Sequence, residues 1–388
     1  MSHRLNPNLL LEIQKYGAAN IEACFNCGNC TAVCPLADDE ANFPRKVIRY
    51  AQIGAEKSLL SSKELWLCYY CGECSTTCPR QAEPGEFMAA ARRFAIANYD
   101  VTGLAKRLYR SAWFNIIITV ALAIFFSLFL LSFNQGTDFA KLALWEFIPE
   151  VYVQILGLAI FGVIGLVGIM GVVRMTRDIY QAGGLAAAHW SKLNWPQALR
   201  ETLAVEVLGH KNYRNEECGQ VDNAPWFWQR WFVHAAMMYG FGGLFAATAL
   251  DFLFKPVGSV VPLYYPMRLL GTIAGLFFMY GTSVAIYKRL RKQDKSASYS
   301  QPSDWIFLIL LWLVGLTGFL LEIAVYAPPP ATWGYTLLII HVVLAMDLLV
   351  LLPFSKFAHV FYRTVAIFVR HLKPVEQTAE SGLAAAEV

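Results

Sequence analysis

Cysteine is concentrated in two copies of one pattern, Cys-x2-Cys-x2-Cys-x3-Cys-Pro, which take up eight of the nine cysteines in the chain. The first copy ends at Cys34-Pro35 and the second at Cys78-Pro79. In runs of this spacing the thiolates hold [4Fe–4S] clusters, and the fourth cysteine of each run ligates the other cluster. The pattern therefore predicts two clusters with the ligand sets Cys24, Cys27, Cys30 and Cys78, and Cys68, Cys71, Cys74 and Cys34.

Other uses of cysteine fit this spacing less well. Disulfides need an oxidising compartment, and residues 1–23 are too polar for a secretory signal peptide. Zinc sites usually show two ligand pairs with a longer spacer between them, and not two sets of four cysteines that each end in proline. The ninth cysteine, Cys218, is expected to be a plain thiol.

The region that follows the cysteine runs has the composition of a membrane protein. The 388 residues are 56% hydrophobic and only 15% charged, which is unusual for a soluble globular chain. Six apolar segments each approach the roughly 20 residues that a spanning helix requires. They are Trp113–Phe133, Val151–Val173, Trp231–Phe254, Pro266–Tyr287, Trp305–Tyr326 and Gly334–Phe354. We expect an all-α fold, in which a helical, two-cluster, ferredoxin-like domain precedes a six-helix transmembrane bundle.

Charge in the connecting segments predicts the orientation, because lysine and arginine collect on the cytoplasmic side of a membrane. The connections 92–110, 174–230, 288–295 and 356–373 are basic, whereas the alternate connections contain only Lys141, Lys255 and Arg268. Both termini and the clusters are therefore expected on the cytoplasmic side of the inner membrane. The net charge of +4 is attributed to topology and lipid headgroups, and not to nucleic-acid binding.

The predicted cluster domain covers residues 1–100. A linker at 101–112 joins it to the membrane domain at 113–360, and a cytoplasmic tail at 361–388 is expected to be disordered after Pro374. The two cysteine runs recur at an interval of 44 residues, which predicts approximate two-fold symmetry. Helices are expected at 44–51, opened by Pro44, and at 62–67, capped by Ser62. The basic stretch 87–110 is expected to form an amphipathic helix at the membrane surface.

Three histidines in or near the spans are candidate haem ligands. A b-type haem needs two axial imidazoles from facing helices, although a lone membrane histidine can equally be a hydrogen-bond partner. At about 1.5 Å per residue, His234 lies about 6 Å inside the cytoplasmic surface, His359 about 5 Å outside it, and His341 about 22 Å deep. His234 and His359 are the better matched pair, while His189 and His210 are at the wrong depth.

Charged groups near the opposite ends of the spans are candidates for handling the protons of a quinone. They are Asp251, Glu322, His341 and Arg268, with Asp347 near the middle of the sixth span. Ionisable groups at membrane depth are functional candidates by default, although those near a helix end can extend to water. Glycines recur every three residues from Gly162 to Gly171, which we interpret as a close-packing face against another helix or a flat macrocycle. No flavin or nicotinamide site is visible, so substrate chemistry is expected in partner subunits.

The segment from His341 to Val360 resembles the last helix of the cytochrome b subunit of respiratory nitrate reductase, with two histidines eighteen residues apart around Pro353-Phe354-Ser355. In that family both histidines are haem ligands, and the partner helix carries two more, ten residues apart. Here His234 is followed by Leu244 at the second position. The resemblance implies one haem between His234 and His359. A second haem on His341 stays open, because its partner is not identified.

The fusion of the two parts resembles the C subunit of quinone-interacting membrane-bound oxidoreductase (Qmo) complexes, whose N-terminal part is similar to the C subunit of heterodisulfide reductase. This resemblance implies electron exchange between menaquinone and flavin and iron–sulfur partner subunits like the A and B subunits of that complex, which serve adenylylsulfate reductase. One alternative is a membrane subunit of another heterodisulfide-reductase-like or tricarballylate-type oxidoreductase. Another is a redox-sensing anchor without haem.

Overall fold

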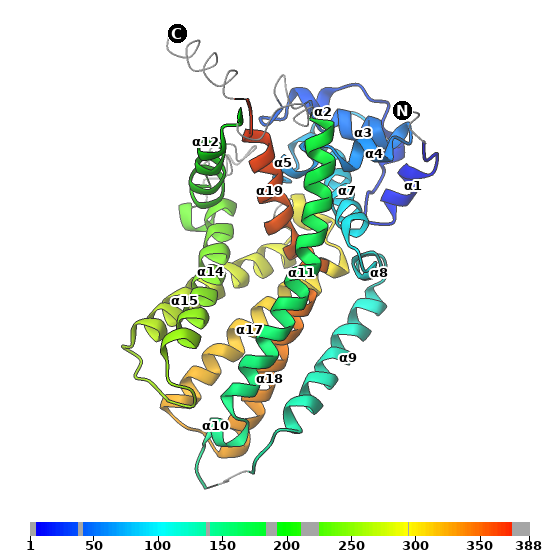
Figure 1. Ribbon diagram of the computed structural model, residues 1–388. Coiled ribbons are helices and arrows are strands. Elements are labelled where there is room, and N and C mark those ends of the chain that lie inside the picture. Colours follow the sequence, from blue (N-terminus) through cyan, green and yellow to red (C-terminus); the bar gives the residue numbers. More distant parts are fainter. Residues whose placement is uncertain are drawn as a thin grey trace. The chain divides into compact units, whose positions relative to one another are not determined.

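The computed structural model describes residues 5–37, 42–136, 140–183, 192–210, 225–293 and 295–374. In these ranges the regular secondary structure is helical (Figure 1), and the β-type contact is an isolated bridge between Leu193 and Pro374. The expectation of an all-α fold is confirmed. His189, Cys218 and residues 375–388 lie outside the described residues, so the expectations for them stay predictions.

The chain separates into two compact units. The first unit consists of Met1–Arg110, Val167–Asp222 and Lys356–Val388, and the second of Ser111–Leu166 and Asn223–Ser355. The long helix α11, Glu150–Ala182, runs from the second unit into the first. The first unit therefore combines the N-terminal residues with two stretches from much later in the chain.

Short helices dominate the N-terminal part of the first unit. They are α1 (Leu9–Gln14), η1 (Ile21–Ala23), α2 (Asn29–Ala32), α3 (Arg45–Gln52), α4 (Glu56–Leu60), α5 (Glu64–Leu67), α6 (Glu73–Thr76), α7 (Pro84–Tyr99) and α8 (Leu104–Arg110). The later stretches add α12 (Trp195–Leu199), the π-helix η4 (Arg200–Leu208), η7 (Lys356–Ala358) and α19 (His359–His371). The expected helix after Pro44 is α3. Ser62 does not cap α5, because its hydroxyl donates to the Glu64 carboxylate at 2.6 Å.

Helix α7 is the core of the N-terminal part. Proline at its first position and a run of alanines favour the helix, and most of its side chains are buried on every side. It packs against α1, α3, α5, α6 and α8. The expectation of one amphipathic surface helix over 87–110 was wrong, because α7 is enclosed by these neighbours and the chain turns at Gly103, with φ +71°, before α8.

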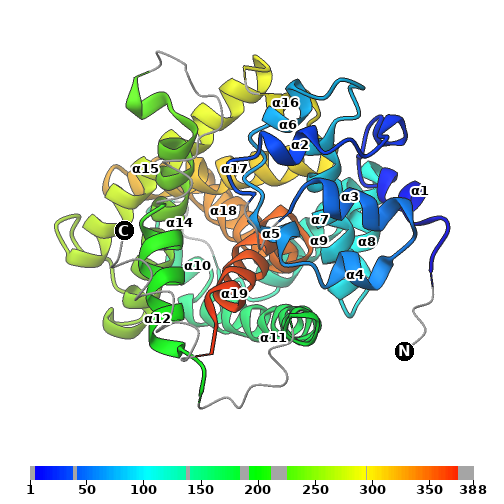
Figure 2. The same cartoon turned by 90° about the horizontal axis from the view of Figure 1, so that it is seen from above.

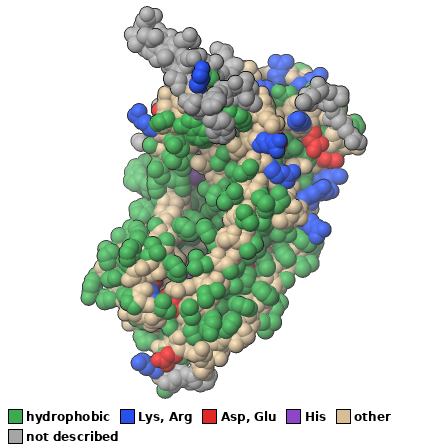
Figure 3. All heavy atoms as spheres, viewed as in Figure 1, with side chains coloured by type: hydrophobic (Ala, Val, Ile, Leu, Met, Phe, Trp, Pro, Cys, Tyr) green, Lys and Arg blue, Asp and Glu red, His purple; other side chains and the backbone are tan. Residues whose placement is uncertain are grey.

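The described residues include six helices long and apolar enough to cross a membrane. They are α9 (Ala112–Leu131), α11, α14 (Arg230–Phe254), α15 (Pro266–Leu290), α17 (Pro302–Tyr326) and the segment Ala331–Phe354, which comprises α18 (Ala331–Leu351) and η6 (Leu352–Phe354). Short helices α10 (Leu144–Phe147), η5 (Trp226–Trp228) and α16 (Lys295–Ser298) lie between them. Figure 3 shows hydrophobic side chains over the visible face, as expected for helices that contact lipid.

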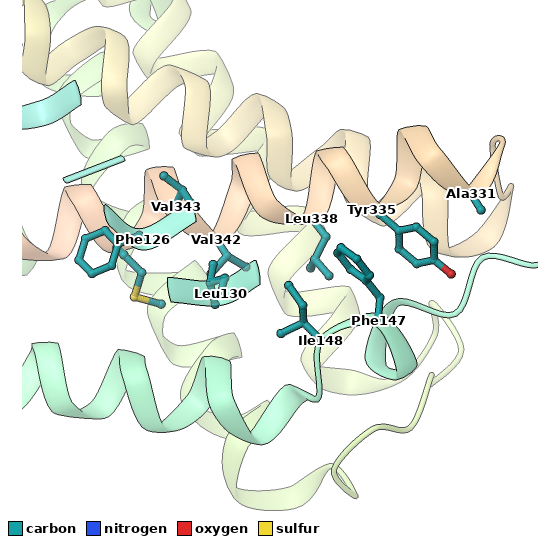
Figure 4. Close-up of a cluster of buried hydrophobic side chains, with 10 residues drawn as sticks. Phe126, Leu130, Phe147, Ile148, Ala331, Tyr335, Leu338, Val342 and Val343 are labelled. Carbon is teal, nitrogen blue, oxygen red and sulfur yellow. The ribbon is translucent and has the colours of Figure 1, made fainter. Parts of the chain in front are cut away.

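Helix α18 forms the centre of the second unit, where it packs against α9, α10 and α17. Figure 4 shows its buried side chains interleaved with those of α9 and α10. The Tyr335 ring stacks on Phe147 at 4.4 Å, and its hydroxyl donates to the carbonyl of Lys141. Half of the most apolar part of the sixth span is buried, a larger share than in any of the other five described spans.

Helices α14 and α15 pack closely through glycine. A Cβ atom on Gly240 would lie 2.5 Å from the backbone nitrogen of Phe278, and one on Gly281 would lie 2.8 Å from the nitrogen of Met237. Small residues let two membrane helices approach in this way. On α11, Gly162 and Gly165 face open space and pack against no helix of the described residues, so the alternative of packing against a flat macrocycle stays a prediction.

Candidate functional site

The two cysteine runs have the same backbone. Gly28 and Gly72, at equivalent positions of the repeat, have φ values of 94° and 93°, and each precedes a one-turn helix, α2 or α6. Asn26 and Tyr70, also equivalent, both lie in the left-handed region, with φ 63° and 59°. Helices α2 and α6 pack together (Figure 2). The 44-residue repeat in the sequence therefore corresponds to a repeated local structure.

The first group of thiols combines three cysteines of the first run with the last cysteine of the second. Burial raises the pKa of Cys24, and the neighbouring charges of Cys78 and Cys27 raise it further. Burial likewise raises the pKa of Cys30 to about 11, with contributions from Cys24, Cys27 and Cys78. Cys78, the last cysteine of the second run, thus lies beside cysteines of the first run.

The second group combines cysteines of the second run with the last cysteine of the first. Burial raises the pKa of Cys34 to about 12, and the charges of Cys68 and Cys71 add to the effect. Burial also raises the pKa of Cys74, beside Cys68, Cys71, Cys30 and Cys34. The neighbours of the shifted thiols thus include cysteines of both runs, and Cys74 lies near Cys30 as well as Cys34, so the division of the eight cysteines into two ligand sets stays a prediction.

These donors fit iron–sulfur clusters. All eight cysteines are free of disulfides, and burial favours the neutral thiol over the thiolate unless a metal supplies positive charge. Backbone N–H groups of Tyr70 and Ala82 donate to the sulfurs of Cys68 and Cys78 at 3.3 and 3.4 Å, and such bonds tune a cluster.

His359 begins α19 in the first unit and is held in one orientation. Its Nδ1 lies 2.6 Å from the carbonyl oxygen of Lys356, so Nδ1 carries the proton and Nε2 keeps its lone pair. Burial lowers the pKa of His359 to about 4, with the charges of Lys356, Arg363 and Arg92 acting in the same direction. A neutral imidazole with a fixed tautomer is the form that binds a metal.

The other histidines are distributed over both units. His234 is half-buried in α14, and His341 lies in α18 with its Nδ1 3.0 Å from the Thr317 hydroxyl of α17, so both belong to the second unit. His210, which the sequence places at the wrong depth, is buried in the first unit at the end of η4. The charge of Arg363 acts on both His210 and His359, so these two histidines share one region of the first unit.

The ends of α14 and α15 that the 255–265 connection joins carry a group of charged side chains. The charges of Arg268 and Asp251 act on each other, and Arg268 also acts on Tyr326. Glu322 of α17 accepts a hydrogen bond from Thr272 at 2.7 Å, and Thr272 lies one turn after Arg268. The structure thus brings Asp251, Arg268 and Glu322 to one end of the second unit.

Two features of this group suggest unused binding capacity. The Nε of Arg268 and one carboxylate oxygen of Asp251 are buried without a hydrogen-bond partner among the described residues. His341 lies deeper, because its partner Thr317 precedes Glu322 by five residues, about 7.5 Å along a helix. Asp347 is fully buried elsewhere on α18, and neither of its oxygens has a hydrogen-bond partner in the described part of the chain.

Two residues near the clusters were missed by the sequence analysis. Arg92 and Arg363 both donate to the backbone carbonyl of Cys68, at 3.1 and 3.2 Å. In the sequence they are two of many basic residues near membrane spans, and Arg363 is 295 positions from Cys68. Only the tertiary fold reveals that they converge.

Comparison with known proteins finds one family over most of the chain and an iron–sulfur domain at the cysteine runs. A family described as citrate utilization protein B matches residues 106–380, and a 4Fe-4S dicluster domain matches residues 20–82. The citrate utilization protein B of Escherichia coli is 29% identical over 303 residues, which is 72% of each chain.

The N-terminal part also resembles components of heterodisulfide reductases. The C subunit of the H(2):CoB-CoM heterodisulfide,ferredoxin reductase of Methanothermobacter thermautotrophicus is 34% identical over 56 residues, 14% of this chain and 30% of that protein. The C2 subunit of the H(2)/formate:CoB-CoM heterodisulfide,ferredoxin reductase of Methanococcus maripaludis is 38% identical over 73 residues, 17% of this chain and 39% of that protein. The expected similarity to the C subunits of heterodisulfide reductases is confirmed for this part.

Proposed function

This chain belongs to the citrate utilization protein B family, and on that premise we propose that it exchanges electrons between menaquinone in the membrane and a cytoplasmic partner. Two [4Fe–4S] clusters and a haem b would supply one-electron steps along the way. The observation that carries the proposal is the pair of cysteine runs with cluster-ligand spacing, whose thiols are all buried or half-buried except Cys27, in a chain whose described residues include six helices long and apolar enough to cross a membrane.

In this proposal each cysteine run supplies three ligands to one cluster and its last cysteine to the other. Cys24, Cys27, Cys30 and Cys78 hold one cluster, and Cys68, Cys71, Cys74 and Cys34 hold the second. The match to a dicluster domain over residues 20–82 supports this assignment, because the range includes both runs.

His359 is the axial haem ligand with the strongest support, because its orientation and neutral state suit iron binding. Two imidazoles compete for the position opposite it. The resemblance to nitrate reductase favours His234, and the position in the first unit favours His210. Single alanine variants at these two positions distinguish them, because only the true ligand changes the haem spectrum and lowers haem content.

The group around Arg268 is the proposed quinone site. Oxidation of a quinol releases two electrons and two protons, so a site must accept protons as well as bind the ring. Asp251 and Glu322 can take up those protons, Arg268 can donate a hydrogen bond to a quinone oxygen, and His341 lies on the inner side of the same region. Asp347 is a separate candidate for proton transfer within the bundle.

The orientation inferred from lysine and arginine places the clusters in the cytoplasm, where they would meet flavin and iron–sulfur subunits like those of the Qmo complex. Two enzymes are proposed as the cytoplasmic system that exchanges electrons with those subunits. The Qmo-like fusion favours adenylylsulfate reductase in sulfate respiration, whereas membership of the citrate utilization family favours a dehydrogenase of a small tricarboxylate such as tricarballylate. Affinity purification from native membranes, with identification of the proteins that co-purify, separates the two.

The first experiment is an anaerobic optical spectrum of the detergent-purified protein, with iron and sulfide analysis, before and after addition of a menaquinol analogue. We expect about eight iron atoms for two cubanes, b-type haem bands, and reduction of those bands by the quinol. The matched variants are Asp251→Asn and Glu322→Gln, which should slow reduction while haem content stays constant. Iron–sulfur clusters without any haem would instead support a redox-sensing anchor.

A further inference from the structure

The two cysteine runs have the same backbone but opposite electrostatic surroundings. The carbonyl of Cys24 in the first run accepts a hydrogen bond from the neutral side-chain amide of Gln52 at 2.7 Å. The equivalent carbonyl of Cys68 in the second run accepts from two guanidinium groups, those of Arg92 at 3.1 Å and Arg363 at 3.2 Å. Both lone pairs of the Cys68 carbonyl are therefore used by positive charges.

Arg363 is fixed in place by three contacts. Its second nitrogen donates to the Leu67 carbonyl at 3.3 Å, and its guanidinium carbon lies 4.1 Å from the centre of the Tyr69 ring. The preceding residue, Tyr362, stacks on Trp66 with the ring centres 5.2 Å apart and the planes 13° apart. Helix α19 is thus attached to the residues immediately before and after Cys68.

The charges of this pair are not compensated by carboxylates. Neither Arg92 nor Arg363 forms an ion pair with a carboxylate in the described part of the chain, and both are half-buried. Their charges oppose each other and both act on the Cys68 sulfur. Two uncompensated like charges held together away from bulk water are unfavourable unless an anionic group lies beside them.

The first run has no comparable pair among the described residues. Its nearest cation, Arg45, donates to the Asn26 side chain at 2.7 Å, but Arg45 is exposed, so water screens its charge. No arginine or lysine is among the causes of the pKa shifts of Cys24 and Cys30, two proposed ligands of the first cluster. The asymmetry is therefore specific to the second run.

We propose that Arg92 and Arg363 are positioning residues that give the cluster of the second run the higher reduction potential of the two. The inference rests on the proposed function, because it requires clusters at both sets of cysteines. Reduction adds one electron to a cluster that is already anionic, and nearby positive charge stabilises the reduced form. No bond forms or breaks in this step. An electron shared between the clusters then resides mainly on the cluster of the second run. Arg363, which lies beside this cluster, belongs to α19, the helix that begins at His359.

The test is a potentiometric titration of purified, cluster-loaded protein, followed by electron paramagnetic resonance of the reduced clusters. We expect Arg363→Gln and Arg92→Gln each to lower the reduction potential of the second-run cluster by about 59 mV. This shift corresponds to about a tenfold decrease in the equilibrium constant for placing an electron on that cluster. A Cys71→Ser variant, which removes the cluster of the second run, identifies the signal that should move. Arg363→Lys keeps the charge and is expected to retain most of the potential, although it loses the bidentate geometry.

Arg45→Gln is the matched control at the first run and should leave both potentials unchanged. The proposal is overturned if the glutamine variants retain full iron content and unchanged potentials, if both clusters shift equally, or if Arg363→Lys behaves like Arg363→Gln. Should Arg363→Gln lose iron, Arg92→Gln provides the decisive measurement. Absence of cluster signals from the unaltered protein would refute the proposed function itself, and is thereby distinguished from failure of this inference.

Discussion

The buried ion pair between Lys255 and Glu150 offers a prediction whose size can be worked from the structure. Lys255 Nζ lies 2.8 Å from both carboxylate oxygens of Glu150, and the two side chains are 1% and 8% exposed. The backbone N–H of Gly258 also donates to Glu150, and Asp251 lies 4.0 Å from Lys255. The pair therefore joins the start of α11 to the end of α14 and the connection that follows.

The perturbation is Lys255→Met, which keeps the volume of the side chain and removes its charge. At 2.8 Å and an effective dielectric constant of 20, the attraction is about 6 kcal/mol, partly offset by desolvation of both ions. Removing one partner leaves Glu150 charged and buried, which costs about 3–5 kcal/mol. The double variant Glu150→Gln/Lys255→Met leaves no unpaired charge, so it should recover at least half of that loss.

The assay is thermal unfolding in detergent, with both single variants and the double variant measured in parallel. At roughly 2–4 °C per kcal/mol for a unit of this size, Lys255→Met should lower the midpoint by about 6–20 °C. The coupling energy follows from the double-mutant cycle. The reasoning is refuted if Lys255→Met shifts the midpoint by only about 1 °C, or if the single effects simply add in the double variant.

Three further predictions concern packing, cluster ligation and pH. Gly240→Leu should destabilise the second unit by about 3 kcal/mol or more in chemical unfolding, because its side chain would meet the α15 backbone, whereas Gly242→Leu faces open space and should be nearly neutral. Cys78→Ser should abolish the same cluster signal in paramagnetic resonance as Cys24→Ser, and loss of different signals would contradict the crosswise assignment. In haem-free protein, burial lowers the pKa of His359 from about 6.5 in the unfolded state to about 4 in the folded state. The unfolded state therefore binds a proton between these pH values and the folded state does not. The free energy of unfolding should be greatest above pH 6.5 and should fall by about 3 kcal/mol as the pH drops to 4. His359→Gln should flatten that part of the pH profile, and an unchanged slope would assign it to other groups.

Local features of the sequence predicted the helical elements of the chain. Hydrophobic length predicted six spans, with differences of a few residues at most ends and a larger one in α11, which continues to Ala182 rather than ending at Val173. This prediction worked because its determinants lie close together in the chain. Ligand spacing is also a property of a short segment, and the crosswise arrangement of the cysteines that it indicates stays a prediction.

Properties that depend on tertiary contacts could not be predicted in this way. The composition of 87–110 suggested a surface helix, but α7 is buried because neighbours from the whole N-terminal part surround it. The glycine period of α11 predicted a close-packing face, yet the close approach of two described helices occurs between α14 and α15, at glycines with no such period. His210 was set aside on depth as a partner for His341, and the fold buries it in the unit of His359 rather than in that of His341. Such contacts depend on the neighbours of a helix, which the sequence of that helix does not specify.

The crossed arrangement of the cysteines has an evolutionary consequence. A chain with a single run would supply three thiols to one cluster, and the fourth could come only from a second copy of itself. Such a chain would work as a symmetric pair, with two identical cubane sites. Two runs within one chain are free of this requirement for identity, because each half can mutate alone. Gln52 beside one run and two arginines beside the other are differences that a symmetric pair could never have acquired.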